Sequence, residues 1–571
     1  MSSNYIFNSV PVMHYPRAQQ DLSHIVKTSG NVGTLYPFDI QEVYAGDSMK
    51  VVTNVVSRLT STFLKPVVDN LFMDMYYFFV PAEQLYDRFG EIFGQNNKSA
   101  WASTEEVSAP ILSSSPSARV VSPKSVANYL QLPVGTLSGN IPINILPFRA
   151  FAKVYDEWFR GQNTISPMHI QTGEIAASEV MNNNPWTPNN YMGMLPKVSK
   201  MHDYFTSALP SPQKGNALNF SLAGSAPLVG TAPIVTHVAH SVNATPVFLS
   251  LRDVSPTATP LNLSFLPNGS GATPTNSGQL STDLTTDTTR VGGYVVPTNL
   301  WADFEKPDNT AFVDLSNVST FSIEDLRLAN RYQMMLERDA RSGTRLTEYY
   351  RAAFGVSTPD LELGRSEFLG GKRIPISITQ VTQTTGSGSD SSPLGDVAAF
   401  SQTGGSSRFN KAFTQHGYVI SVFCVRQFHT YQQGVERFWT RHNRLDYYDP
   451  LFSSIGEQPI YSSELYAFGE DEDAERRVFG YGPAWSDLRN RQNKITGQLV
   501  SGITDSLDKW HFGDYYANAP TLNESFINET PQFVDRAISV ESSVQDQFLF
   551  DFYIKNRAWR RLPVDSIPKL A

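Results

Sequence analysis

The chain has 571 residues, of which 40% are hydrophobic, 12% aromatic and only 17% charged, where about a quarter charged is typical of a soluble protein. The net charge of −9, with no run of Lys or Arg at either end, argues against a protein that condenses nucleic acid through a basic tail. The single cysteine, Cys424, excludes an intrachain disulfide, and the first residues show no signal-peptide pattern. We therefore expect a chain made and folded in a reducing cytoplasm, with much of its surface facing other protein.

The first third of the chain predicts an arm followed by strands. Residues 1–33 are rich in turn residues and are expected to form an extended arm that serves assembly. From Met49 to Leu59 apolar and polar residues alternate, with Lys50, Asn54 and Arg58 on the polar face, which predicts a half-buried strand. The run from Leu71 to Val80 is apolar on both faces and about half the roughly 20 residues that a membrane span needs, so it predicts a strand covered on two sides.

Two helical regions are expected. Aromatic residues recur at helical spacing between Phe148 and Phe159, which predicts an amphipathic helix packed against the core. A second helix is expected to open at Ser322, whose hydroxyl can cap the backbone, to be interrupted at Gly343 and to end at Gly355. The 37 glycines and 36 prolines are spread along the chain, which favours many turns and short strands.

Two stretches of low charge are expected to be loops or insertions. Between residues 216 and 300 only five of 85 residues are charged, and a segment this long inside a domain is usually functional or disordered. We expect residues 216–310 to form a low-charge surface insertion, folded as a β-rich projection rather than disordered. The Gly/Ser-rich stretch 386–407 is expected to be a mobile loop by composition.

The last third of the chain returns to strands and carries the one arrangement that favours a ligand. Tyr418–Phe428 is apolar on both sides, so Cys424 is expected to be a buried small hydrophobe. The final strand has apolar residues from Phe548 to Ile554 on one face. The candidate nucleic-acid-binding residues, cations with an aromatic among them, come on or just after its other face: Lys555, Arg557, Trp559, Arg560 and Arg561. Cations for phosphates and an aromatic for stacking are what sequence-tolerant binding of single strands requires. The alternative is that this face pairs with acidic residues of a neighbouring copy.

Motifs for catalysis or metal binding are not supported by their spacing. His202-Asp203 and His237/His240 lack further ligands nearby, and the acidic run Glu470–Asp473 lacks the spacing of a calcium loop, so we expect no metal, no cofactor and no enzymatic activity. Two other function classes stay open. A glycosidase on a β-sandwich would need two specific carboxylates, and a lectin-like adhesin would use the 216–310 region to bind sugars.

Several blocks of sequence resemble the major capsid proteins of the Microviridae, the small single-stranded-DNA bacteriophages, and especially the gokushovirus group. The segment Lys200–Gly215 is similar to their signature segment, and further blocks follow in the family's order over most of the chain: Pro66–Asn70 with Tyr76–Pro81, Ala340–Arg345 with Glu348–Tyr349, Glu367–Gly371, Phe479–Tyr481 with Ala484–Trp485, Leu507–His511 and Gln547–Leu549. At Gly513 the family pattern has alanine. Residues 216–310 carry no specific resemblance.

The resemblance implies a mainly β fold: one antiparallel eight-stranded jelly-roll domain over residues 1–571, with large loop insertions and a few helices. It further implies self-assembly of identical copies into a T=1 icosahedral shell around circular single-stranded DNA, together with other virion proteins of the phage. The insertion at 216–310 would form protrusions at the threefold axes and could contribute to attachment to a receptor on the host cell. The protein would be part of the virion capsid, assembled in the bacterial cytoplasm without membrane insertion.

Overall fold

The computed structural model describes residues 16–95, 107–215, 228–229, 234–236, 300–302, 312–313, 323–343, 345–382, 384, 397–468 and 477–564. The chain divides into two compact units, the larger formed by residues 1–216 and 333–571 and the smaller by residues 217–332. Within the smaller unit, β8 (Leu228–Val229) pairs with β11 (Phe312–Val313), and β9 (Ile234–Thr236) pairs with β10 (Leu300–Ala302). The remaining residues of the predicted 216–310 insertion lie outside the described residues.

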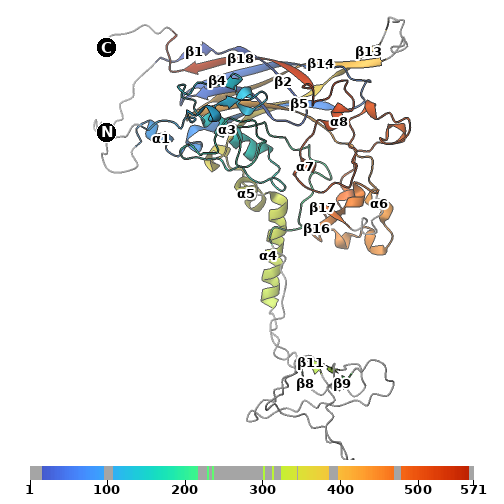
Figure 1. The fold of residues 1–571 in the computed structure, drawn as a ribbon. Helices are drawn as coiled ribbons and strands as arrows, with labels where there is room; N and C mark the ends of the chain where they lie inside the picture. Colours follow the sequence, from blue (N-terminus) through green and yellow to red (C-terminus); the bar gives the residue numbers. More distant parts are fainter. Residues whose placement is uncertain are drawn as a thin grey trace, which may run out of the picture. The chain divides into compact units, whose positions relative to one another are not determined.

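The larger unit is built on two antiparallel sheets (Figure 1). The first, here called the large sheet, has the order β1-β18-β4-β14-β13, with β2 also paired to β18. Its strands are β1 (Ala18–Asp21), β2 (His24–Gly30), β4 (Ser48–Leu59), β13 (Ile378–Thr382), β14 (Val397–Ala412) and β18 (Phe548–Arg560). The second, the small sheet, has the order β12-β5-β15-β3. Its strands are β3 (Tyr36–Val43), β5 (Leu71–Pro81), β12 (Glu367–Ile376) and β15 (Gly417–Gln427).

The core lies between these two sheets and is rich in aromatic rings. Phe552 of β18 stacks on Phe38 of β3, with ring centroids 4.4 Å apart, and both rings contact Phe423 of β15. Such aromatic pairs bury large apolar areas and prefer offset or tilted geometries like these. The period-two alternation of β4 and β18 places their apolar side chains in this core, as the sequence predicts.

The small sheet is covered on its second face as well. Phe78, Ile420 and Cys424 point away from the first core and pack with α3 (Leu146–Val154) and the π-helical turn Tyr155–Phe159 that follows it. The predictions of apolar strands at 71–80 and 418–428, of an aromatic helix at 148–159 and of a buried Cys424 are therefore confirmed. A strand buried on both faces needs apolar residues at most positions, which is why the period-two signal disappears there.

The remaining helices and strands are short, apart from two. The long helix α4 covers Ile323–Ser342, and α5 (Leu346–Phe354) ends at Gly355, whose φ of 69° makes it a left-handed C-cap. The expected break at Gly343 and end at Gly355 are thus confirmed, whereas the expected cap Ser322 lies outside the described residues. Besides several 3-10 turns, the other α-helices and strands are α1 (Phe89–Ile92), α2 (Val126–Tyr129), α6 (Arg437–Thr440), α7 (Glu524–Ile527), α8 (Gln532–Asp535), β6 (Val120–Val121), β7 (Gly135–Thr136), β16 (Glu457–Tyr461) and β17 (Val478–Pro483).

Two other expectations concern strands of the large sheet. The prediction of a mobile loop over 386–407 is wrong from Val397 onward, because β14 runs from there to Ala412 between β4 and β13. Its small polar residues satisfy the ladder through their backbone groups, which composition does not reveal. Of the expected arm 1–33, residues 18–21 and 24–30 are extended along β18 as β1 and β2, and residues 1–15 lie outside the described residues.

Candidate nucleic-acid interface

The outer face of the large sheet is formed by every second residue of β18 and its neighbours. Along β18 the side chains alternate strictly, with Phe548, Phe550, Phe552 and Ile554 buried and Leu549, Asp551, Tyr553, Lys555 and Arg557 exposed. The sequence prediction of two faces for this strand is therefore confirmed. No other element covers these residues in the part of the chain that the structure describes, so the outward row is in contact with solvent.

Pairing brings further cations beside the predicted residues. In the register of the sheet, Arg557 lies opposite Lys50 of β4, and Lys555 lies opposite Val52, which itself lies opposite Arg408 of β14. Arg58 of β4 and Lys27 of β2 extend the row on the same exposed face. The alternation of residues 49–59 already predicted that Lys50 and Arg58 share one face of a strand. No local signal in the sequence indicates that these residues, or Arg408, lie beside β18.

The resulting surface is basic although the whole chain is acidic. Six cations, Lys27, Lys50, Arg58, Arg408, Lys555 and Arg557, point outward from the strands, against two carboxylates, Asp21 and Asp551. Hydrogen bonds from the hydroxyl and backbone N–H of Ser23, aided by the nearby charges of Arg557 and Lys555, hold the pKa of Asp21 below its ordinary value. An excess of four positive charges on one sheet face is suited to the phosphates of a nucleic-acid backbone.

The other predicted residues occupy different positions. Trp559 is half-buried on the outward row, opposite Gln19 and Ser48, and Arg561 is exposed just beyond the strand. Arg560 points the other way: it forms a 2.9 Å ion pair with buried Asp47 and donates a 2.6 Å hydrogen bond to the carbonyl of Glu42. Its guanidinium group is thus occupied within the fold, and Arg560 is not part of the basic face. Tyr553, which is 45% exposed, adds an aromatic ring to that face.

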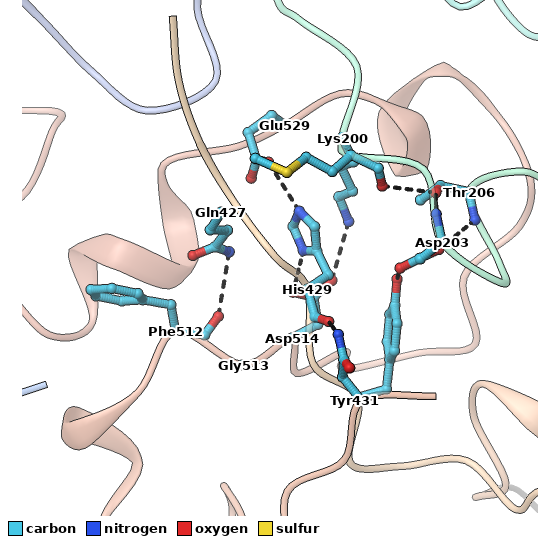
Figure 2. A network of polar contacts seen from close by, with 12 residues as sticks. Lys200, Asp203, Thr206, Gln427, His429, Tyr431, Phe512, Gly513, Asp514 and Glu529 are labelled. Atoms are coloured by element: carbon cyan, nitrogen blue, oxygen red, sulfur yellow. Dashed lines mark hydrogen bonds and ion pairs between the residues drawn. The ribbon is translucent and has the colours of Figure 1, made fainter. Parts of the chain in front are cut away.

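The segment 200–215, where the sequence offered His202-Asp203 as a metal pair, is a structural turn. One carboxylate oxygen of Asp203 accepts hydrogen bonds from the backbone N–H groups of Phe205 and Thr206. Its other oxygen accepts a hydrogen bond from the hydroxyl of Tyr431 (Figure 2). His202 is exposed beside it. Within the described ranges, no group of three or more His, Cys, Asp or Glu side chains is arranged to hold a metal ion. His237, His240 and Glu470–Asp473 lie outside these ranges.

Behind this turn lies a buried network of two cations and two carboxylates (Figure 2). His429 contacts Asp514 at 2.7 Å and Glu529 at 3.0 Å, and the amine of Lys200 lies 3.1 Å from the second oxygen of Asp514. Burial opposes a charge on His429, but the two carboxylates outweigh it and raise the pKa of His429 to about 10. With His429 and Lys200 both charged the network is neutral, and it ties the 200–203 segment to the end of β15 and to residues 514–529.

The departure from the family pattern at Gly513 has a local cause. A Cβ atom at Gly513 would lie 2.0 Å from Cδ1 of Ile495, so the isoleucine side chain occupies the space that an alanine methyl group would need. The Cβ atom would also lie 2.9 Å from Nδ1 of His511 and 3.0 Å from Oγ1 of Thr430, so the substitution affects a small group of contacts beside the buried network. It leaves the basic face unchanged, because residues 495 and 513 are in neither sheet.

Two antiparallel sheets packed face to face, with long connections between their strands, form an architecture found in the structural proteins of virus particles. Comparison with known proteins agrees. Residues 8–570 match the profile of the family described as "Capsid protein (F protein)". The chain belongs to this capsid protein family.

Three relatives are similar over nearly their whole length. The chain is 34% identical to capsid protein VP1 of Spiroplasma virus 4, over 98% of this chain and 96% of the relative. It is 33% identical to capsid protein VP1 of Bdellovibrio phage phiMH2K and 32% identical to that of Chlamydia phage 1, in each case over 99% of this chain. The resemblance to the microvirus capsid proteins is thereby confirmed. No helix among the described residues is long and apolar enough to cross a membrane.

Proposed function

We propose that this protein is the major subunit of a T=1 icosahedral shell that encloses a circular single-stranded DNA genome, and that its fold is an eight-stranded jelly roll. The order β2-β18-β4-β14 in one sheet and β3-β15-β5-β12 in the other supports the fold. Taken in chain order, these eight strands cross repeatedly between the sheets, as they do in a double Greek key. Strands β1 and β13 add only to the edges of the large sheet.

We place the packaged DNA against the basic outer face of the large sheet. Its excess of positive charge, with Tyr553 and Trp559 beside the cations, supports contact with phosphates and bases without sequence preference. Membership of the capsid family favours DNA, rather than an acidic face of a neighbouring copy, as the partner of this basic face. A shell of chains with net charge −9 must neutralise phosphates through local patches of this kind. This basic face is the observation that carries the proposed role in packaging.

The residues of the larger unit that join it to the 217–332 insertion lie beyond the small sheet. The chain leaves the body after Lys214 and returns near Leu336, and the N–H of Lys214 donates a hydrogen bond to the carbonyl of Leu336. Shortly after this return, Arg345 donates to the carbonyl of Asp156 in the π-helical turn, on the far side of the small sheet. We propose that the insertion projects outward as a protrusion at the threefold axis and contributes to attachment to the host cell, while other virion proteins complete the shell. Synthesis and assembly would take place in the bacterial cytoplasm.

Assembly is tested by electron microscopy of the purified full-length protein under conditions that favour association. Closed spherical particles of uniform size are expected, because repeated heterologous contacts between identical copies must close on symmetry axes. A protein that stays monomeric at high concentration would contradict the proposed shell.

The DNA contact is tested with the double variant Lys555→Gln/Arg557→Gln and a short oligothymidylate. Binding to the wild-type protein should weaken with salt, and the slope of log K against log salt should fall by about 0.7 for each lost phosphate contact. The matched control is Arg351→Gln, which removes an exposed cation from α5. Equal affinities and slopes for the double variant and the wild type would refute the assignment of DNA to this face.

A further inference from the structure

A cavity of about 670 Å³ lies outside the small sheet, on the side opposite the basic face. Its walls come from the π-helical turn and the residues after it, from the 199–209 segment, from the end of α4 and the start of α5, and from the strand residues Arg373 and Arg426. All these residues belong to the larger unit. A volume in the range of about 300–1,000 Å³ is typical of sites for small ligands.

The lining of this cavity is strongly cationic. Six of its side chains carry a positive charge: Arg160, Lys200, Arg341, Arg345, Arg373 and Arg426. Glu348 is the one carboxylate among its lining residues in the described part of the chain. The other carboxylates that pair with these cations are not among the residues that line the cavity, so the surface presented to a ligand favours an anion.

Ion pairing leaves one of these charges uncompensated. Four of the cations are neutralised by carboxylates: Arg160 pairs with Asp156, Arg341 with Glu457 and Arg345 with Glu348, and Lys200 belongs to the neutral network of His429, Asp514 and Glu529. Arg373 and Arg426 share a single carboxylate, that of Asp74, which is 1% exposed in the middle of β5. This pair therefore carries a net positive charge at the wall of the cavity.

Arg373 is the member of the pair that can reach a ligand. Its Nε and Nη2 atoms donate to the two oxygens of Asp74, at 2.7 and 3.0 Å, and its Nη1 atom has no hydrogen-bond partner among the described residues. The side chain is 41% exposed, against 15% for Arg426. Asp74 thus holds the guanidinium plane in a fixed orientation, with one edge open to the cavity.

Aromatic rings complete the cavity. Trp158, Phe159 and Phe428 line it, and Phe428, which is 42% exposed, lies under the guanidinium of Arg373 with 6.0 Å between the group and the ring centroid. A planar cation beside an exposed ring is the combination that binds a phosphate and stacks a base.

We propose that this cavity binds the phosphate group of a nucleotide, with Arg373 contacting the phosphate and Phe428 contacting the base. The site goes beyond the proposed packaging role, because the cavity and the basic face lie on opposite sides of the sandwich. The nucleotide is either free or part of a strand, and the two sources share the chemistry that the cavity recognises.

The test is calorimetric titration of the full-length protein with inorganic phosphate, with dAMP and with a short oligothymidylate. Saturable binding of dAMP is expected, and Arg373→Gln should weaken it at least tenfold. Arg373→Lys should restore part of the affinity, since it keeps the charge. Phe428→Leu should weaken dAMP more than inorganic phosphate. Each variant is expected to stay folded, because Asp74 keeps Arg426 as a partner in all of them. Thermal melting checks this for each variant.

The control and the outcomes separate this site from the basic face. Arg408→Gln, which removes a cation of the large sheet, should leave dAMP binding unchanged. Competition between dAMP and the oligonucleotide would assign the site to a strand, and binding of dAMP without competition would assign it to a free nucleotide. The proposal is overturned if neither phosphate nor dAMP gives saturable heat, or if Arg373→Gln binds dAMP as the wild type does.

Discussion

The outer faces of the two sheets differ in what covers them. The large sheet presents a bare, alternating face with Lys50, Lys555 and Arg557 in contact with solvent, whereas the central strands β5 and β15 of the small sheet are buried on both sides beneath α3 and the loops around it. The same secondary structure therefore supports two kinds of surface. A bare face can carry charge at little cost, whereas a covered face can carry it only when each charge has a partner.

The charged residues of the two faces illustrate this difference. Asp551 on β18 is exposed and forms no ion pair among the described residues, while Asp74 on β5 is almost fully buried and is bonded by two guanidinium groups. Burial opposes ionisation of Asp74, but the hydrogen bonds from Arg373 and the charge of Arg426 outweigh it and keep its pKa below the ordinary value. The charge of Asp74 on the small sheet is therefore structural, whereas the exposed charges of the large sheet are free to bind a ligand.

The largest effect is expected from Asp74→Ala. This variant leaves the mostly buried Arg426 without its carboxylate, and breaking such a buried pair costs about 3–5 kcal/mol of the free energy of unfolding. Urea denaturation followed by circular dichroism measures the change. The matched control is Asp551→Ala, for which a change within about 0.5 kcal/mol is expected. Similar losses for the two variants would mean that the two faces do not differ as described.

The sequence predicted the parts of this contrast that depend on period and composition. The alternation of 49–59 and of 548–559 gave the two faces of β4 and β18, and the unbroken apolar runs gave the doubly covered strands β5 and β15. The pairing of strands that are distant in the chain could not be predicted from the sequence. No local pattern places Arg408 beside Val52, or directs both Arg373 and Arg426 to Asp74, because these residues are hundreds of positions apart and meet only through the sheet register.

The buried network around His429 should make stability depend on pH. The pKa of His429 in the folded protein, about 10, lies above its ordinary value of 6.5. The contribution of His429 to the free energy of unfolding is therefore fully present below pH 6.5 and is lost as the pH rises through 10. The free energy of unfolding should fall by on the order of a few kcal/mol across this window. Thermal melts between pH 6 and 10 measure it. His429→Gln should have a flatter profile, and an unchanged slope in this variant would assign the effect to other groups.

The finest comparison is between two arginines of one strand. Arg560 turns inward to its ion pair with Asp47, whereas Arg557 points outward beside Lys50. Arg560→Ala is expected to lower the free energy of unfolding by about 1–2 kcal/mol, since Asp47 is buried and loses its partner, and to leave the affinity for oligothymidylate unchanged. Arg557→Ala should do the reverse, with stability changed by less than about 0.5 kcal/mol and a weaker, less salt-dependent affinity. If Arg560→Ala weakened DNA binding as much as Arg557→Ala does in a folded protein, the direction of the side chain would not decide its role, and the whole end of β18 would have to be counted as part of the interface.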